Sequence, residues 1–151
     1  MAQQDSAVAQ RYDFWLGTWA AAWTNTDGTA GHATNTVTRI MDGKVIHEHF
    51  VDIASKFEGM SMSVFDPRDS LWHQAWADNN GSYFDFTGGS VDGAPSFITA
   101  PRIKADKVII ERMLFKDITH ASFVWDWERS TDNGRTWTLA WRINYTRLGD
   151  P

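Results

Sequence analysis

The chain has 151 residues, no cysteine and a formal net charge of −5, with acidic and basic residues interspersed. This length suits one domain that buries its own core without disulfides or metal, and the lack of cysteine excludes thiol nucleophiles and zinc–thiolate sites. The lack of a basic stripe and of a long apolar run argues against nucleic acid and membrane as partners.

The segment from Met1 to Gln10 has neither the basic region nor the apolar region of a signal peptide. As written, this start indicates a cytoplasmic chain, and it is equally the start expected of a periplasmic or secreted chain whose signal peptide was removed. We expect residues 1–10 to form a flexible tail. A short helical turn within residues 7–16 is expected to place Phe14 and Trp15 over one end of the fold.

Turn signals recur along the rest of the chain and separate runs in which apolar and polar residues alternate. Asp42-Gly43 and Asp92-Gly93, for example, supply the positive φ angles that tight hairpins need. The pattern predicts ten strands, at about residues 17–24, 32–41, 44–52, 59–65, 70–77, 82–88, 95–101, 107–115, 121–130 and 136–147. Because the loops are short, we predict an all-β fold, a single antiparallel meander β-barrel over residues 1–151.

Aromatic residues make up 14% of the chain, enough to line a barrel with rings or to fill its core. By alternation the rings fall on one face of each strand, and we assign that face to the interior because ring burial is the largest available driving force. The side chains assigned to the interior are Ile46, Glu48, Phe50, Trp72, Gln74, Trp76, Asp78, Phe123, Trp125, Trp127, Trp137, Leu139, Trp141, Ile143 and Tyr145.

Polar groups therefore lie among rings, where an unpaired carboxylate is costly. A wet cavity or a bound ligand would explain Glu48, Gln74 and Asp78, and so would pairing with an arginine such as Arg112 or Arg142. The sequence leaves these two explanations open.

The leading hypothesis is a barrel that binds a small, largely apolar or aromatic molecule in its cavity. Tryptophans would form the walls, and Glu48, Gln74 and Asp78 would orient the ligand's polar atoms. The predicted ligand-binding residues are Trp72, Gln74, Trp76, Trp125, Trp127, Trp141 and Arg142.

A competing hypothesis is a cofactor-independent enzyme, a lyase, isomerase or cyclase, that uses the same cavity. An apolar pocket raises the pKa of a carboxyl group, so Glu48 or Asp78 would act as general acid or base. Tyr145 or Arg142 would stabilise an oxyanion if directed inward. A third class, a scaffold with a filled interior and a large apolar outer patch, is disfavoured by the polar outer faces, although the sequence is compatible with a homodimer through the barrel wall.

His47 and His49 form a His-x-His pair on one strand, the spacing with which some barrels hold a metal. The alternation places both histidines opposite Glu48, on the outer face, so a solvated strand surface is favoured over a metal site. We predict no metal and no cofactor.

Several segments resemble the small bacterial lipocalin-like proteins of unknown function. They are Asp13–Trp19, Val45–Phe50, Ser63–Pro67 with Trp72–Asp78, and Trp125–Ser130 with Asp132–Trp137. The resemblance spans about residues 12–147 and implies a calycin-like antiparallel barrel of eight to ten strands with a ligand cavity.

Within that resemblance, Leu16-Gly17-Thr18-Trp19 is similar to the Gly-x-Trp signature at the first strand of lipocalins and fatty-acid-binding proteins, where the tryptophan closes the barrel end. The family implies no settled activity, so no catalytic residue is carried over. Heme-binding members of the wider barrel group use a late proximal histidine. The last histidine here, His120, lies at a predicted turn or strand start and does not favour that role.

Overall fold

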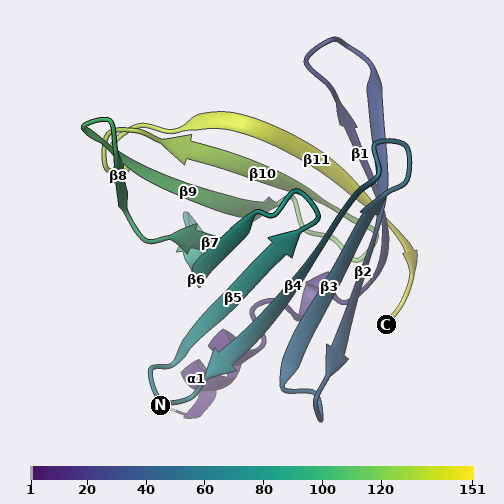
Figure 1. Ribbon diagram of the computed structural model, residues 1–151. Helices are drawn as coiled ribbons and strands as arrows, with labels where there is room; N and C mark the ends of the chain where they lie inside the picture. Colours follow the sequence, from purple (N-terminus) through teal and green to yellow (C-terminus); the bar gives the residue numbers. More distant parts are fainter. Residues whose placement is uncertain (1) are drawn as a thin grey trace.

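The computed structural model describes the backbone of residues 2–151 and the side chains of residues 6–151. A short N-terminal helix and a 3-10 turn precede a continuous antiparallel meander (Figure 1). The elements are α1 (Ala2–Ala9), the 3-10 helix (Asp13–Trp15), β1 (Gly17–Thr24), β2 (Ala30–Ile40), β3 (Val45–Asp52), β4 (Phe57–Asp66), β5 (Leu71–Asp78), β6 (Tyr83–Val91), β7 (Ala94–Thr99), β8 (Arg102–Lys104), β9 (Lys107–Lys116), β10 (Ser122–Ser130) and β11 (Thr138–Gly149).

Ten of these strands close into a barrel, which confirms the predicted fold class. Each strand pairs with its neighbour along the chain, β7 pairs with β9, and β1 pairs with β11 to complete the ring. The short strand β8, which the sequence did not predict, pairs only with the beginning of β9 and lies outside the ring. Closure removes free sheet edges and creates an interior.

Tight turns follow the chemistry read from the sequence. Asp92 and Gly93, between β6 and β7, have φ values of 49° and 83°, so both lie in the left-handed region that a two-residue hairpin turn requires. Ala105 and Asp106 adopt the same conformation between β8 and β9, with φ values of 49° and 61°. There an alanine occupies a position that favours glycine.

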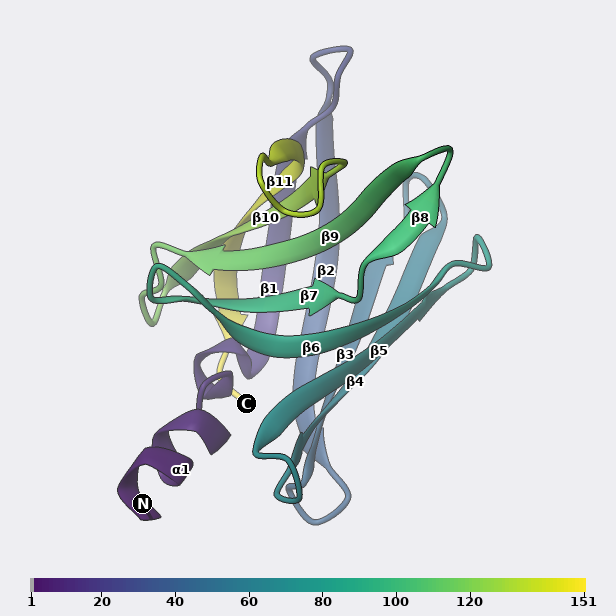
Figure 2. The same ribbon diagram turned by 90° about the vertical axis from the view of Figure 1, so that its left-hand side faces the viewer.

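The N-terminal segment closes one end of the barrel. Helix α1 begins earlier than the helical turn predicted within residues 7–16 and lies below the barrel (Figure 2). The Trp72 indole Nε1 donates a hydrogen bond of 2.8 Å to the Val8 carbonyl and so holds the end of α1 against β5. Trp15 is buried and Phe14 packs edge-on against Phe115, so both residues lie over this end as expected.

Trp19 belongs to the same closed end. Its ring is fully buried, and its Nε1 donates to the Trp15 carbonyl at 2.8 Å. The Arg147 guanidinium lies 4.1 Å from the centroid of that ring and donates to the Leu16 carbonyl at 2.7 Å. Through Arg147, strand β11 therefore holds the segment that precedes β1 in place. This is the position that the Gly-x-Trp resemblance implied for Trp19.

The assignment of strand faces is correct for β3, β5 and β10 but fails at the beginning of β11. The register shifts there, because Trp127 pairs with Trp141 whereas Glu128 pairs with Leu139. This β-bulge turns Leu139 outward, where it is 45% exposed. Trp137 also lies outside, with the Arg112 guanidinium 3.7 Å from its ring centroid. The prediction that Trp137 and Leu139 face the interior is therefore wrong.

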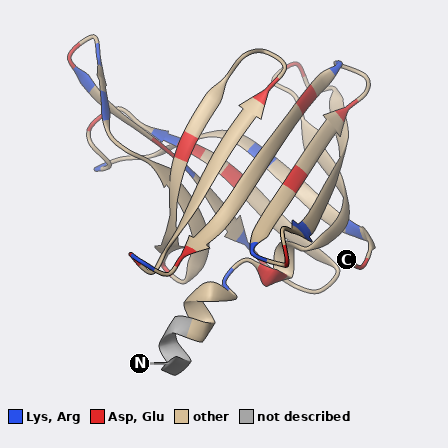
Figure 3. Ribbon diagram, turned by 60° about the horizontal axis from the view of Figure 1, so that its bottom comes forward, with Lys and Arg blue, Asp and Glu red and all other residues tan. Residues whose placement is uncertain are grey.

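Charged residues of both signs are interspersed along the barrel strands and turns (Figure 3). Among the described residues, no helix has the length and apolar character needed to cross a membrane.

Tyr12 gives a test of the closed end. Its hydroxyl donates to the Ser96 carbonyl at 2.6 Å inside the core, and burial raises the pKa of this tyrosine well above its usual value. Tyr12→Phe should lower the free energy of unfolding by about 1–2 kcal/mol, because a buried hydrogen bond is lost and an acceptor left unpaired. The matched change Tyr83→Phe, at a side chain 67% exposed, should alter it by less than about 0.5 kcal/mol. Urea denaturation measures both, and equal effects would contradict the proposed role of Tyr12.

Candidate functional site

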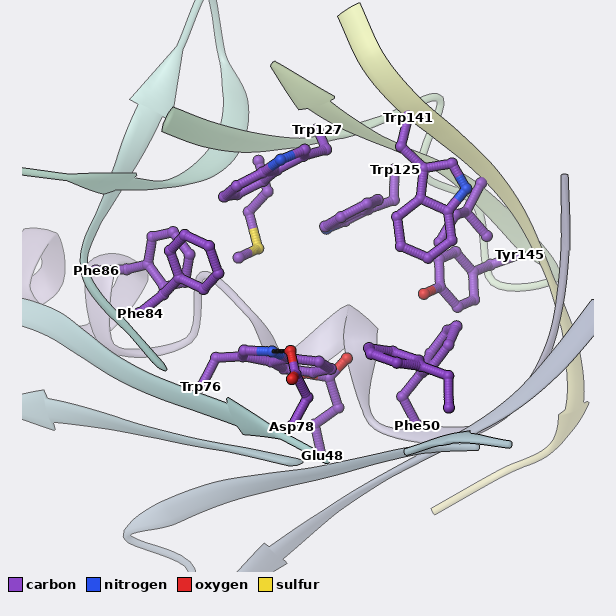
Figure 4. Close-up of a pocket in the computed structure, with 13 residues that line it drawn as sticks. Glu48, Phe50, Trp76, Asp78, Phe84, Phe86, Trp125, Trp127, Trp141 and Tyr145 are labelled. Carbon is purple, nitrogen blue, oxygen red and sulfur yellow. Dashed lines mark hydrogen bonds between the residues drawn. The ribbon is translucent and has the colours of Figure 1, made fainter. Parts of the chain in front are cut away.

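A cavity of about 180 Å³ lies inside the barrel (Figure 4). It lies towards the end opposite α1. The course of β5 shows its place: Trp72, at the beginning of the strand, contacts the N-terminal segment, whereas Trp76 and Asp78, at its end, line the cavity. The lining residues are Glu48, Phe50, Phe57, Trp76, Asp78, Phe84, Phe86, Met113, Trp125, Trp127, Trp141, Ile143 and Tyr145.

Three tryptophans form one wall. Trp125 and Trp127 are two residues apart on β10, so both point inward, and their rings are parallel with centroids 6.1 Å apart. Trp141 from β11 meets Trp125 edge-on, with centroids 5.7 Å apart. Each ring is thus held by its neighbours, and the wall keeps its shape without a ligand.

Trp76 forms the opposite wall, and its ring depends on a glycine beneath it. A Cβ atom at Gly59, on the adjacent strand β4, would lie 2.1 Å from this ring, so only glycine leaves room for it. Phe57 stacks nearly parallel to Trp76 with centroids 6.4 Å apart. The sequence analysis assigned no role to Gly59, because a glycine in a strand shows which side chain covers it only once the strands are paired.

Asp78 lies at the end of β5, where the chain turns. Its Oδ2 accepts a hydrogen bond of 3.0 Å from the Trp76 indole, and its Oδ1 accepts the backbone N–H groups of Asn80 and Ser82 at 3.0 and 3.2 Å. Three donors therefore hold this carboxylate in one orientation beside the cavity.

Glu48 lies deeper, on β3, and is only 8% exposed. Asn35 Nδ2 donates to its Oε1 at 2.9 Å, and Ser61 Oγ donates to its Oε2 at 2.7 Å. Burial raises the pKa of Glu48 to about 7, although these two hydrogen bonds favour the ionised form. No salt bridge to Glu48 occurs within the described part of the chain, so desolvation prevails.

Tyr145 directs its hydroxyl into the cavity from β11 (Figure 4). Burial is the main cause that raises the pKa of Tyr145 well above its usual value, and the neighbouring Glu48 carboxylate raises it further. The phenol stays protonated at neutral pH and can donate a hydrogen bond to a molecule in the cavity. Glu48 and Tyr145 together form a proton acceptor and a proton donor that face one space.

Most of the predicted site residues meet in this cavity. The structure brings together Glu48, Asp78, Tyr145, Trp76, Trp125, Trp127 and Trp141. Trp72 does not line the cavity because it packs edge-on against Tyr12, with ring centroids 5.2 Å apart, at the closed end. Gln74 is buried between the cavity and the closed end, and its Nε2 donates to Ser63 Oγ at 2.9 Å.

Arg142 lies outside the barrel. Its guanidinium donates to both carboxylate oxygens of Asp126 on the outer face, at 2.6 and 2.7 Å. Even positions of β11 face outward in this stretch, since Ile143 and Tyr145 face inward. Arg142 therefore neither contacts a ligand in the cavity nor pairs with Glu48.

The sequence analysis named no site role for the remaining lining residues, which are Phe50, Phe57, Phe84, Phe86, Met113 and Ile143. Alternation had placed Phe50 and Ile143 on the inner face, and the same rule applied to β6 would have found Phe84 and Phe86. Met113 carried no such signal, because β9 is mostly apolar on both faces.

The histidine pair lies on the outer face, as alternation predicted. His49 Nε2 lies 2.6 Å from Glu58 Oε1. Within the residues that the structure describes, no group of three or more histidine, cysteine, aspartate or glutamate side chains is placed to hold a metal ion.

The chain matches no protein-family model, and comparison with the curated proteins finds no significant match.

Replacing Glu48 by glutamine tests whether burial disfavours the ionised form of this carboxyl group. A pKa of about 7 in the folded protein, against 4.5 for an ordinary glutamate, means that the folded state binds the proton more tightly. Stability is therefore lost as pH rises from 4.5 to about 7, by roughly 3 kcal/mol for this group. Glu48→Gln should remove this loss, so the variant becomes more stable relative to the native protein as pH rises through that range. Urea denaturation across the range measures the difference, and a constant difference would contradict the assignment.

Proposed function

We propose that the chain binds a small, largely apolar or aromatic molecule in the barrel cavity. The observation that supports this most strongly is the cavity itself, about 180 Å³ of space between aromatic walls. An apolar cavity of about 150 Å³ is known to hold benzene, so the space here suits one aromatic ring with a short substituent. Such a ligand would bury its apolar surface against the rings and be oriented by a few polar groups.

The polar groups are few and convergent, as in pockets that orient a ligand. Glu48, Asp78 and Tyr145 come from three different strands and line the same cavity. The strands are paired through their backbones, and Glu48 adds side-chain hydrogen bonds to Asn35 of β2 and Ser61 of β4. The energetic cost of keeping Glu48 in an apolar interior supports a role in recognition.

The proposal also assigns the chain to the family of lipocalin-like, calycin-type barrel proteins. The closed meander, the 3-10 turn before β1 and the buried Trp19 beneath the Arg147 guanidinium support it. The cavity lies towards the end opposite Trp19, the residue that the resemblance places at the closed end.

A cavity-filling variant tests the proposal. Intrinsic tryptophan fluorescence should change when small aromatic compounds are titrated into the protein, because four tryptophans line the cavity. Ile143→Phe places a ring in the cavity and should weaken binding by at least about tenfold. Leu139→Phe, the same kind of change on the outer face of the same strand, should leave binding unaltered. If no compound in the panel changes the fluorescence, or both variants bind as the native protein does, the proposal fails.

A second candidate function is a cofactor-independent enzyme in the same cavity. The observation that favours it is the pairing of Glu48, with a pKa of about 7, and the Tyr145 hydroxyl in one space. A base with that pKa is suited to removing a proton from carbon at neutral pH, and the phenol would donate to the oxyanion that forms. This chemistry matches an isomerase, lyase or cyclase.

Solvent exchange tests this second function. A carbonyl compound that binds in the cavity should exchange its acidic C–H for deuterium when incubated with the protein in heavy water. Glu48→Gln should slow this exchange by at least about a hundredfold while binding changes little, because the base is lost but the walls remain. Glu58→Gln, on the outer face, is the control and should leave the rate unchanged. Equal rates in Glu48→Gln and the native protein would exclude Glu48 as the base.

A further inference from the structure

The cavity carries an unusual balance of charge. The carboxyl groups that line it are those of Glu48 and Asp78, and within the described residues no lysine, arginine or histidine lines it. Both carboxylates already accept hydrogen bonds from protein donors, yet an ionised carboxylate has four lone-pair positions and donates nothing. The interior therefore offers acceptors and negative charge and lacks a positive partner.

The arginines of the neighbouring strands β9, β10 and β11 are paired with other carboxylates. Arg112 donates to Glu128 at 2.7 Å, and Arg142 donates to Asp126 at 2.6 Å, both on the outer face. Glu111 shares the inward face of β9 with Met113 but does not line the cavity, and it is paired with Arg129 at 2.6 Å and with Arg102 at 3.2 Å. The carboxylates of Glu128, Asp126 and Glu111 are thus neutralised by arginine, whereas within the described residues those of Glu48 and Asp78, which line the cavity, are not. The difference gives the cavity a net negative potential.

The walls themselves attract positive charge. Trp125 and Trp127 lie across the cavity from Trp76, and phenylalanine side chains line the rest of its aromatic wall (Figure 4). The faces of aromatic rings carry partial negative charge, and tryptophan binds a cation most strongly of the aromatic side chains. Aromatic rings combined with carboxylates form the surroundings in which proteins bind organic ammonium groups.

We propose that the ligand of this cavity is a small organic cation, an amine with an apolar or aromatic body, whose ammonium group lies beside Glu48 and Asp78. This inference rests on the proposed binding function and narrows its ligand class. A neutral ligand would leave the buried Glu48 carboxylate without a counter-charge, and an anion would be repelled by both acids.

The two carboxylates have different roles in binding the cation. Asp78, held by three N–H donors at the end of β5, presents a fixed negative charge near the end of the barrel and favours entry of a cation. Glu48, deeper and 8% exposed, pairs with the ammonium group after entry. The Tyr145 hydroxyl oxygen, which faces the same space, accepts a further N–H.

Binding of a cation is coupled to the ionisation of Glu48. A cation stabilises the carboxylate, so affinity should rise as pH increases through about 7, where Glu48 ionises. The other titratable groups that line the cavity are Asp78 on β5 and Tyr145 on β11, and the tyrosine stays protonated in this range. An alkylamine keeps its charge up to about pH 10, so the ligand's own titration does not interfere.

Three probes of nearly the same size and different charge give the test: phenethylamine, phenethyl alcohol and phenylacetate. Dissociation constants are measured by tryptophan fluorescence and calorimetry at about pH 8, where Glu48 is ionised. Phenethylamine should bind at least about tenfold more tightly than the alcohol, and phenylacetate should bind most weakly. The ratio between amine and alcohol should fall as pH is lowered below 7.

Glu48→Gln should remove most of the amine's advantage and leave the affinity for the alcohol nearly unchanged. Glu58→Gln removes one negative charge from the outer face of β4 and is the matched control, with no effect expected on either ligand. Circular dichroism checks that each variant folds. If Glu48→Gln does not fold, Asp78→Asn and the pH dependence of the amine-to-alcohol ratio in the native protein decide the question.

The outcomes separate this inference from the proposed function. If the alcohol binds as tightly as the amine, the cavity binds ligands but is not selective for cations, and only this inference is overturned. An amine preference that survives both Glu48→Gln and Asp78→Asn also overturns it, because the charge would then be recognised elsewhere. If none of the probes and no compound of the aromatic panel binds, both proposals fail.

Discussion

Pairing between the first and last strands is the constraint on which the rest of this structure depends. Residues Thr18 to Ala22 of β1 pair with Gly149 to Asn144 of β11, and this contact turns a meander into a closed ring. Without it the aromatic faces would lie open to water. Arg147 strengthens the closure, because its guanidinium covers Trp19 and reaches the carbonyl of Leu16.

Closure also makes the two ends of the interior different. Tyr12 and Trp15 enter the closed end from outside the sheet and fill it, with the Tyr12 ring stacked 4.4 Å from that of Phe97. No such segment fills the opposite end within the described residues, so the rings there surround a space. The same residue types thus form a solid core at one end and walls at the other.

Two carboxyl groups buried in the barrel wall show how the surroundings decide the charge state. Asp126 is fully buried, but hydrogen bonds from Arg142 and Lys116 lower its pKa. Glu48 is buried beside neutral donors alone, and desolvation raises its pKa to about 7. A neighbouring cation would reverse that shift, which is why the inner acid, and not the outer one, is suited to ligand recognition or proton transfer.

The sequence by itself determined the fold class, the ten strands of the barrel and most side-chain directions, because turn residues and the two-residue period of a strand are local properties. They were sufficient to place Glu48, Trp76, Asp78 and the inward rings of β10 on one surface. Only the tertiary structure decided which inward residues reach the cavity. Trp72 and Gln74 share a face with Trp76, yet the N-terminal segment packs over their end of the barrel. It also decided the orientation of Leu139, because a bulge depends on the pairing of two strands and leaves no mark in the sequence of one.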